Sequence, residues 1–163
     1  MRDAARARHP DEACGLLWGP VSGPVSGPVS VHVSGPVSGP VSGDADMLGE
    51  DRAHISCFEE AANVHPTPRT HFEIDPQALI NAHRAQRDGA AAVEAGGQTG
   101  AASGALVGYF HSHPTGPARP SACDAQMAVG DGKIWAIAAG EDVTFWRDEA
   151  EGFCALSFVI VDP

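Results

Sequence analysis

The chain has 163 residues, the size of one domain, which is enough to bury a hydrophobic core without a disulfide or metal staple. Ten Lys and Arg residues against 21 Asp and Glu give a formal net charge of −11. This charge argues against a nucleic-acid groove or an anionic membrane surface as partner, and leaves a protein partner open. We find no window near the roughly 20 apolar residues of a membrane span, and no signal-peptide pattern. Four scattered cysteines without CxxC favour free thiols, so we expect a cytoplasmic protein.

The first predicted strand is the short apolar run ACGLLWG, residues 13–19. A repeat follows over residues 19–43, in which five tetrads read GPVS and one reads VHVS. Proline removes a backbone donor at every fourth residue and glycine weakens regular structure. We therefore expect a low-complexity loop rather than a central strand, with a flap that contacts substrate as the alternative. Residues 52–64 then form the returning strand of a hairpin that carries the repeat at its tip.

The clearest helix is DPQALINAHRAQRDG, residues 75–89. Asp75 can cap it, Pro76 suits the first helical position and Gly89 can end it. The following residues, 88–104, are rich in glycine and alanine and indicate a second loop.

The C-terminal part is rich in strand patterns. A short helix is expected directly after Asp124, between the first and second of four predicted strands. These strands are ALVGYFHSH at 105–113, KIWAIAAG at 133–140, VTFWR at 143–147 and FCALSFVIV at 153–161. Strands at both ends of the chain with a helix between them indicate the α+β class.

The most informative stretch is HSHPTGPARPSACD, residues 111–124. On a strand, His111 and His113 point to the same face, and a proline then ends the strand. The loop that follows delivers Ser121 and Asp124 to the start of a helix, where a carboxylate is favoured. Two imidazoles and one carboxylate are three protein ligands, the number typical of catalytic zinc, which keeps a fourth position open. We therefore expect Zn²⁺ at His111, His113 and Asp124.

Readings without a metal compete with this one. Ser121 and Asp124 also form S-x-x-D, the pattern of a helix capping box. Cys123 is a poor additional ligand, because adjacent residues rarely reach one metal with good geometry. Hydrolysis at zinc also needs a general base, and Glu12 in HPDEACGLLWG is the candidate. Read alone, this glutamate is a solvated charge at the end of a short helix.

The sequence HSHP followed by S-x-x-D resembles the JAMM motif, E…HxH(x7)SxxD, of the JAB/MPN family. The segment EACGLL resembles the one that carries the family's glutamate, and NVHPTPRTHFEIDP, residues 63–76, resembles the stretch ahead of the helix in bacterial members. The resemblance runs from about Pro10 to the C-terminus, apart from the repeat and residues 88–104. It implies a single domain over 1–163 with the MPN (JAB, cytidine-deaminase-like) fold, a curved mixed β-sheet packed with helices.

The resemblance also implies roles for individual residues. His111, His113 and Asp124 would hold one catalytic Zn²⁺, Glu12 would act as general base and then acid, and Ser121 would hydrogen-bond the oxyanion. The implied activity is hydrolysis of a peptide or isopeptide bond after the C-terminus of a ubiquitin-like or sulfur-carrier protein, either deubiquitinase-like or cysteine-releasing. The alternatives are a non-catalytic MPN scaffold in a protein complex, which the complete motif disfavours, and a cell-wall peptide hydrolase.

Two weaker hypotheses concern residues outside this motif. His65 and His71 flank the expected substrate side and would contact a peptide. Cys14 and Cys123 each lie close in sequence to an expected site residue, and would form a redox-sensitive pair if they were neighbours.

Overall fold

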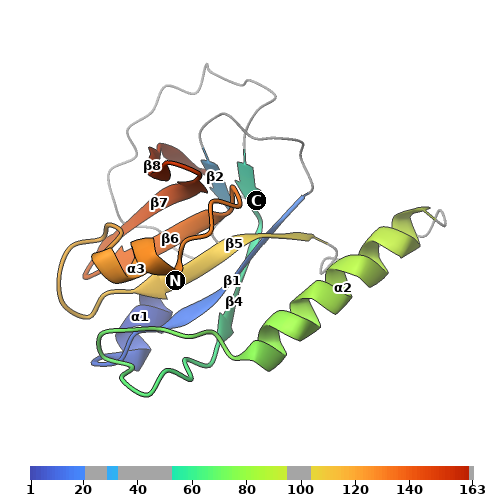
Figure 1. The fold of residues 1–163 in the computed structure, drawn as a ribbon. Coiled ribbons are helices and arrows are strands. Elements are labelled where there is room, and N and C mark those ends of the chain that lie inside the picture. The colour runs from blue at the N-terminus through green and yellow to red at the C-terminus, as the bar shows by residue number, and fades with distance from the viewer. Residues whose placement is uncertain (21–28, 33–52, 95–103, 162–163) are drawn as a thin grey trace.

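The computed structural model describes residues 1–20, 29–32, 53–94 and 104–161. Its main sheet has six strands in the order β4-β1-β5-β6-β7-β8, and all neighbours are antiparallel except the parallel pair β5 and β6 (Figure 1). The strands are β1 (Cys14–Gly19), β4 (Cys57–Ala61), β5 (Ala105–Ser112), β6 (Ile134–Ala139), β7 (Asp142–Glu149) and β8 (Gly152–Leu156). This mixed sheet with helices confirms the expected α+β class, and the pairing of β4 with β1 confirms the predicted return of the chain.

Helices cover both faces of the sheet. The short helix α1 (Arg2–Arg8) places Ala4 in a core cluster with Leu17 and Phe110. On the other face, the start of α2 (Pro76–Glu94) packs with Leu16 and Trp135. Because both faces are covered, the expected strand at β1 is a continuous apolar run rather than an alternating one. Each fully buried leucine in such a run contributes about 1.5–3 kcal/mol.

Helix α2 is longer than the expected 75–89, and the loop expected over 88–104 is wrong over the first part of that range. Gly89 lies inside the helix, where glycine costs about 1 kcal/mol relative to alanine. Three alanines follow it in the sequence, and alanine is the best helix former. Ala82 is buried, whereas residues 83–88 are exposed. Figure 1 accordingly shows α2 projecting away from the sheet.

A small second sheet corrects the prediction for the repeat. Its order is β3-β2-β9, with β2 (Val29–His32) between and parallel to β3 (Ala53–Ile55) and β9 (Phe158–Val161). The VHVS tetrad interrupts the GPVS pattern and leaves residues 29–34 without glycine or proline, which is why a strand is possible there. The remaining expected loop residues, 21–28, 33–43 and 95–103, lie outside the described part.

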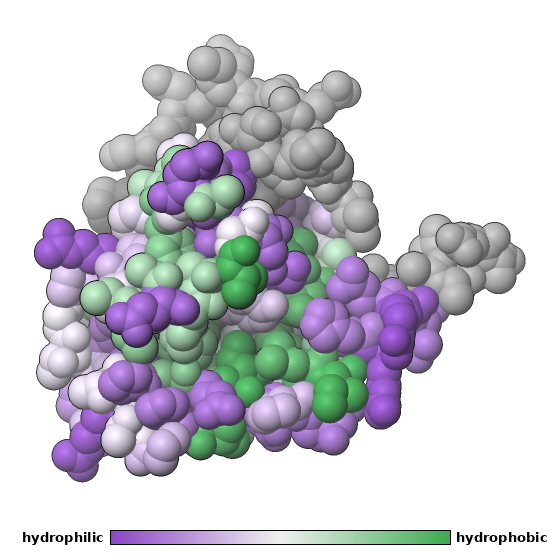
Figure 2. Space-filling model, viewed as in Figure 1, coloured by the Kyte–Doolittle hydropathy of each residue, from purple (hydrophilic) through white to green (hydrophobic). Residues whose placement is uncertain are grey.

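The strand predicted over 153–161 is divided at Ser157 into β8 and β9, which belong to different sheets. The helix expected after Asp124 begins earlier, as α3 (Ala122–Met127). Figure 2 shows apolar side chains gathered in the middle of one face, with hydrophilic ones along α2. In the described parts of the chain, no helix combines the length and the apolar character that crossing a bilayer requires.

Candidate metal centre

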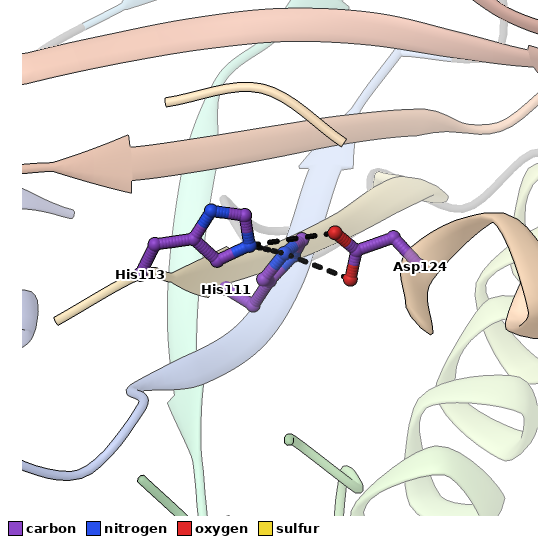
Figure 3. A group of neighbouring side chains, drawn as sticks. All are labelled: His111, His113 and Asp124. Carbon is purple, nitrogen blue, oxygen red and sulfur yellow. Dashed lines mark hydrogen bonds and ion pairs between the residues drawn. The ribbon is translucent and has the colours of Figure 1, made fainter. Parts of the chain in front are cut away.

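Three side chains converge where β5 ends and α3 begins (Figure 3). His111 is the penultimate residue of β5 and His113 follows the strand, so both rings lie on one face. Asp124 reaches them from the first turn of α3. His111 and Asp124 are buried, at 0% and 3% exposure. The structure thus brings together the three residues that the sequence predicts as metal ligands.

The separations of the ligand atoms fit a small tetrahedral cation. Nε2 of His111 lies 3.0 Å from Nε2 of His113, and these nitrogens lie 3.2 and 3.4 Å from Oδ1 and Oδ2 of Asp124, respectively. With zinc–ligand bonds of about 2.0–2.1 Å, tetrahedral corners are roughly 3.3–3.4 Å apart. The printed separations are close to this value, so the three residues can supply three corners of a tetrahedron and leave the fourth to a ligand from outside the protein.

Neighbouring groups orient both imidazole rings. The carbonyl of Pro117 accepts a hydrogen bond from Nδ1 of His113 at 2.9 Å, so the lone pair of His113 lies on Nε2, facing the other ligands. The ring of His111 stacks on Phe72 with ring centroids 4.3 Å apart. The burial of His111 lowers its pKa and outweighs the opposing effect of Asp124, which favours the neutral ring that a metal requires.

Asp124 takes part in a helix cap and in the ligand cluster at once. The backbone N–H of Ser121 donates to Oδ2 of Asp124 at 2.6 Å, and the N–H of Asp124 donates to the Ser121 hydroxyl at 3.1 Å. The cap occupies Oδ2 and leaves Oδ1, beside His111, as the better placed metal ligand. Burial alone would raise the pKa of Asp124, but hydrogen bonds from His111 and His113 hold it well below its usual range.

Glu12 lies beside this cluster and is 7% exposed. Its burial raises its pKa to about 7, with His113 opposing the rise and Asp124 adding to it. Two hydrogen bonds join the next residue, Ala13, to the end of β5: its N–H donates to the Ser112 hydroxyl at 2.8 Å, and its carbonyl accepts from the Ser112 N–H at 2.9 Å. This link places Glu12 next to the histidines, although 99 positions separate Ala13 from Ser112.

Asn63 holds the other side of Glu12 and was missed by the sequence reasoning. Its amide NH₂ donates to the carbonyls of Glu12 and His71 at 3.0 and 3.1 Å. Its amide oxygen accepts from the backbone N–H groups of His65 and Glu73. An asparagine within the stretch NVHPTPRTHFEIDP is the available sequence signal, but nothing local shows that its partner is Glu12, just ahead of β1.

A cavity of about 420 Å³ opens over this cluster. Its lining includes Glu12, His113 and Ser121, so the expected base, one expected metal ligand and the expected oxyanion donor face one space. Arg69 and Arg119 also line it. A bound group could therefore touch all three expected kinds of site residue at once.

The two weaker hypotheses fare differently. His65 and His71 stack on each other with ring centroids 4.7 Å apart, and contact with a peptide stays a prediction for them. Cys14 is fully buried, its thiol contacts the Ala61 carbonyl, and burial raises its pKa to about 12. A thiol held in this way is inert, because the thiolate is the reactive form. These features disfavour a redox-sensitive pair with Cys123, and the pair stays a prediction for non-reducing intact mass to test; both thiols are free in the structure.

Comparison with known proteins gives concordant findings. A family model described as prokaryotic homologues of the JAB domain matches residues 1–149. A probable TtuB-protein conjugate cleaving protease of Thermus thermophilus is 39% identical over 67 residues, which are 40% of this chain and 36% of that protein. A desampylase of Haloferax volcanii is 29% identical over 136 residues, 83% of this chain and 68% of that protein. This chain thus spans only about a third of the Thermus protein.

Solved structures show the same fold at low identity. A protein of Desulfitobacterium hafniense superposes with a TM-score of 0.66 at 23% identity, over 100% of this chain and 87% of that one. A protein of Salinibacter ruber gives a TM-score of 0.54 at 23% identity, over 100% and 86% of the two chains.

Proposed function

The chain belongs to the family of prokaryotic JAB-domain homologues, and on that premise we propose that it is a zinc-dependent peptidase of the JAMM type. The observation that carries the proposal is the shared cavity: Glu12 and Ser121 line the same space as His113, which belongs to a cluster of three side chains that could hold a metal ion. Its substrate is a ubiquitin-like or sulfur-carrier protein, cut at the peptide or isopeptide bond after its C-terminus. The names of the Thermus and Haloferax relatives favour this substrate class.

The donor set fits zinc on the evidence of its chemistry and spacing. Two neutral imidazoles and one carboxylate suit Zn²⁺, and His111, His113 and Asp124 would hold it. When bound, zinc supplies Lewis acidity, which makes water nucleophilic near neutral pH and polarises a carbonyl.

The proposed role of Glu12 is to move the proton. A general base works best when its pKa lies near the working pH, and burial brings the pKa of Glu12 to about 7. As a carboxylate it takes a proton from the attacking water, and as a carboxylic acid it returns that proton to the leaving amine. One side chain can therefore serve both halves of the hydrolysis.

The proposed role of Ser121 is to hydrogen-bond the developing oxyanion. Its hydroxyl oxygen accepts the N–H of Asp124, and the O–H of the same group remains available to donate. A donor that faces the cavity beside the ligand cluster can hydrogen-bond the carbonyl oxygen as negative charge builds on it. In this way the capping role and the proposed catalytic role of Ser121 are compatible.

The test uses zinc-loaded protein and Gly-Gly-linked fusions of a bacterial ubiquitin-like or sulfur-carrier protein, read by intact mass. We expect cleavage after Gly-Gly by the wild type, loss of cleavage in Glu12→Gln, and unchanged cleavage in Glu73→Gln, an exposed glutamate whose backbone also bonds Asn63. Tight zinc binding without cleavage of any fusion would instead favour the non-catalytic scaffold.

A further inference from the structure

The proposed base lies outside the regular elements of the fold. Glu12 falls between α1, which ends at Arg8, and β1, which begins at Cys14, so neither helix nor sheet hydrogen bonds fix its backbone. Glu12 is nevertheless buried, and it lines the cavity. Buried backbone groups outside a helix or sheet need partners from elsewhere in the chain. The place of the Glu12 carboxylate therefore depends on the groups that hold its main chain.

Contacts with residues far along the chain hold the backbone at this point. The N–H of Glu12 donates to the Pro68 carbonyl at 2.7 Å. The Glu12 carbonyl accepts from the amide NH₂ of Asn63 at 3.0 Å. The two hydrogen bonds between Ala13 and Ser112 join the next residue to the end of β5. Among these contacts, the bond from Asn63 is the one that a side chain makes to Glu12 itself, so a single substitution can remove it.

Asn63 uses its whole hydrogen-bonding capacity in this place. An asparagine amide offers two N–H donors and one oxygen with two lone pairs. The donors go to the carbonyls of Glu12 and His71. The oxygen accepts the N–H groups of His65 at 3.1 Å and of Glu73 at 3.0 Å. Because carbonyls only accept and backbone N–H groups only donate, these partners require an amide, and aspartate, although it has the same shape, would lose two of the four bonds.

The segment to which Asn63 is bonded is itself fixed against the ligand cluster. Two of the four partners, His71 and Glu73, flank Phe72 in the chain. Phe72 is buried in a core cluster, and its ring stacks on His111 with centroids 4.3 Å apart and planes 14° apart. The position of this segment relative to His111 is therefore set by packing. Asn63 transmits that position to the main chain of Glu12.

We infer that Asn63 is a positioning residue, which sets the place of the Glu12 carboxylate relative to the expected metal ligands. This inference rests on the proposed function. A base must lie within hydrogen-bond reach of the proton it takes, and a displacement of about 1 Å can cost about a hundredfold in rate. The bonds of Asn63 go to segments other than β5 and α3, which carry His111 and Asp124. Loss of Asn63 should therefore lower kcat and leave zinc binding intact.

The first measurement needs neither zinc nor substrate. Amide hydrogen exchange is followed by NMR in the wild type, in Asn63→Ala and in the isosteric Asn63→Asp. We expect the Glu12 and Ala13 amides to exchange about tenfold faster or more in both variants, while the amides of β5 and β6 keep their rates. Asn81→Ala is the matched control, because the Asn81 side chain is exposed on α2 and bonds Gln77 of the same helix.

Two results of this measurement would overturn the inference. Wild-type exchange rates at Glu12 and Ala13 in both variants would show that Asn63 does not hold this backbone. The same acceleration throughout β5 and β6 would show that Asn63 supports the fold in general rather than the base.

The second measurement is kinetic and uses the zinc-loaded protein with the Gly-Gly-linked fusions. We expect Asn63→Ala and Asn63→Asp to lower kcat by about tenfold or more, with KM and the zinc affinity in a chelator competition within about threefold of the wild type. An unchanged kcat, or a loss of zinc affinity as large as the loss of kcat, would overturn the inference. If the wild type cleaves no fusion, the proposed function fails, and the exchange rates alone decide whether Asn63 positions Glu12.

Discussion

Replacement of Glu12 by glutamine should change how the stability of the metal-free protein depends on pH. The free energy of unfolding of the variant, minus that of the wild type, should be larger at pH 8 than at pH 4.5. Burial raises the pKa of Glu12 from 4.5 to about 7, which corresponds to roughly 3 kcal/mol at about 1.4 kcal/mol per pH unit. Because the folded pKa is raised, the protonated group favours the folded state. Its contribution is complete below pH 4.5 and is lost as the pH rises through about 7. Glutamine stays neutral throughout and loses nothing.

The assay is urea unfolding of both chains in the presence of a chelator, at several pH values from about 4.5 to about 8. The measured quantity is the difference in free energy of unfolding between Glu12→Gln and wild type, because the other titrating groups then cancel to first order. We expect this difference to rise in favour of the variant by up to about 3 kcal/mol across the range. Glu73→Gln, at an exposed position, controls for removal of a charge. A difference that is flat with pH would refute the desolvation of Glu12.

Three further substitutions test how the site is built. Gly108→Ala would place a Cβ 1.9 Å from the carbonyl oxygen of Ile134 on the paired strand, so we expect a loss of roughly 3 kcal/mol or more in urea unfolding; wild-type stability would contradict the pairing of β5 with β6. Thr144→Val removes the donor to the Ala118 carbonyl beneath the histidine loop and should weaken zinc binding several-fold in a chelator competition, which Thr144→Ser should restore. Asp148→Ala leaves two backbone N–H groups of the loop after α3 without their acceptor and should cost about 2–3 kcal/mol; a loss under 0.5 kcal/mol would refute that anchoring.

The ligand cluster is predictable because its geometry is local. The alternation of side chains along a strand places His111 and His113 on one face, and the capping box fixes Asp124 at the third position of α3. These rules operate within a few residues of one another. The loop between His113 and Ser121 is short, so the start of α3 must lie near the end of β5.

The contacts around Glu12 join residues that are far apart in the sequence, so they could not be predicted in the same way. The Ser112–Ala13 hydrogen bonds and the four bonds of Asn63 depend on which strands pair, and many sequences offer a serine or an asparagine. The resemblance pointed to Glu12, but the residues alone favoured a solvated charge. The structure shows a buried one instead.

The two errors in the predicted secondary structure also have physical reasons. Gly89 was expected to end α2, but a glycine inside a helix costs only about 1 kcal/mol, which neighbouring alanines can offset. Likewise, the average composition of the repeat concealed the short valine-rich run that forms β2. In both places the residues beside a glycine or proline outweigh the effect of that one residue on local structure.

The parallel pairing of β5 with β6 has a consequence for how the ligand cluster first forms. The two strands can pair only after the crossover between them, residues 113–133, has closed, and that crossover carries Asp124 while β5 carries His111. The pairing also fixes one expected ligand directly, because the backbone N–H of His113 donates to the Ala138 carbonyl of β6 at 2.7 Å. The proposed hydrolytic centre is therefore complete only in molecules in which this non-local pairing of strands has formed.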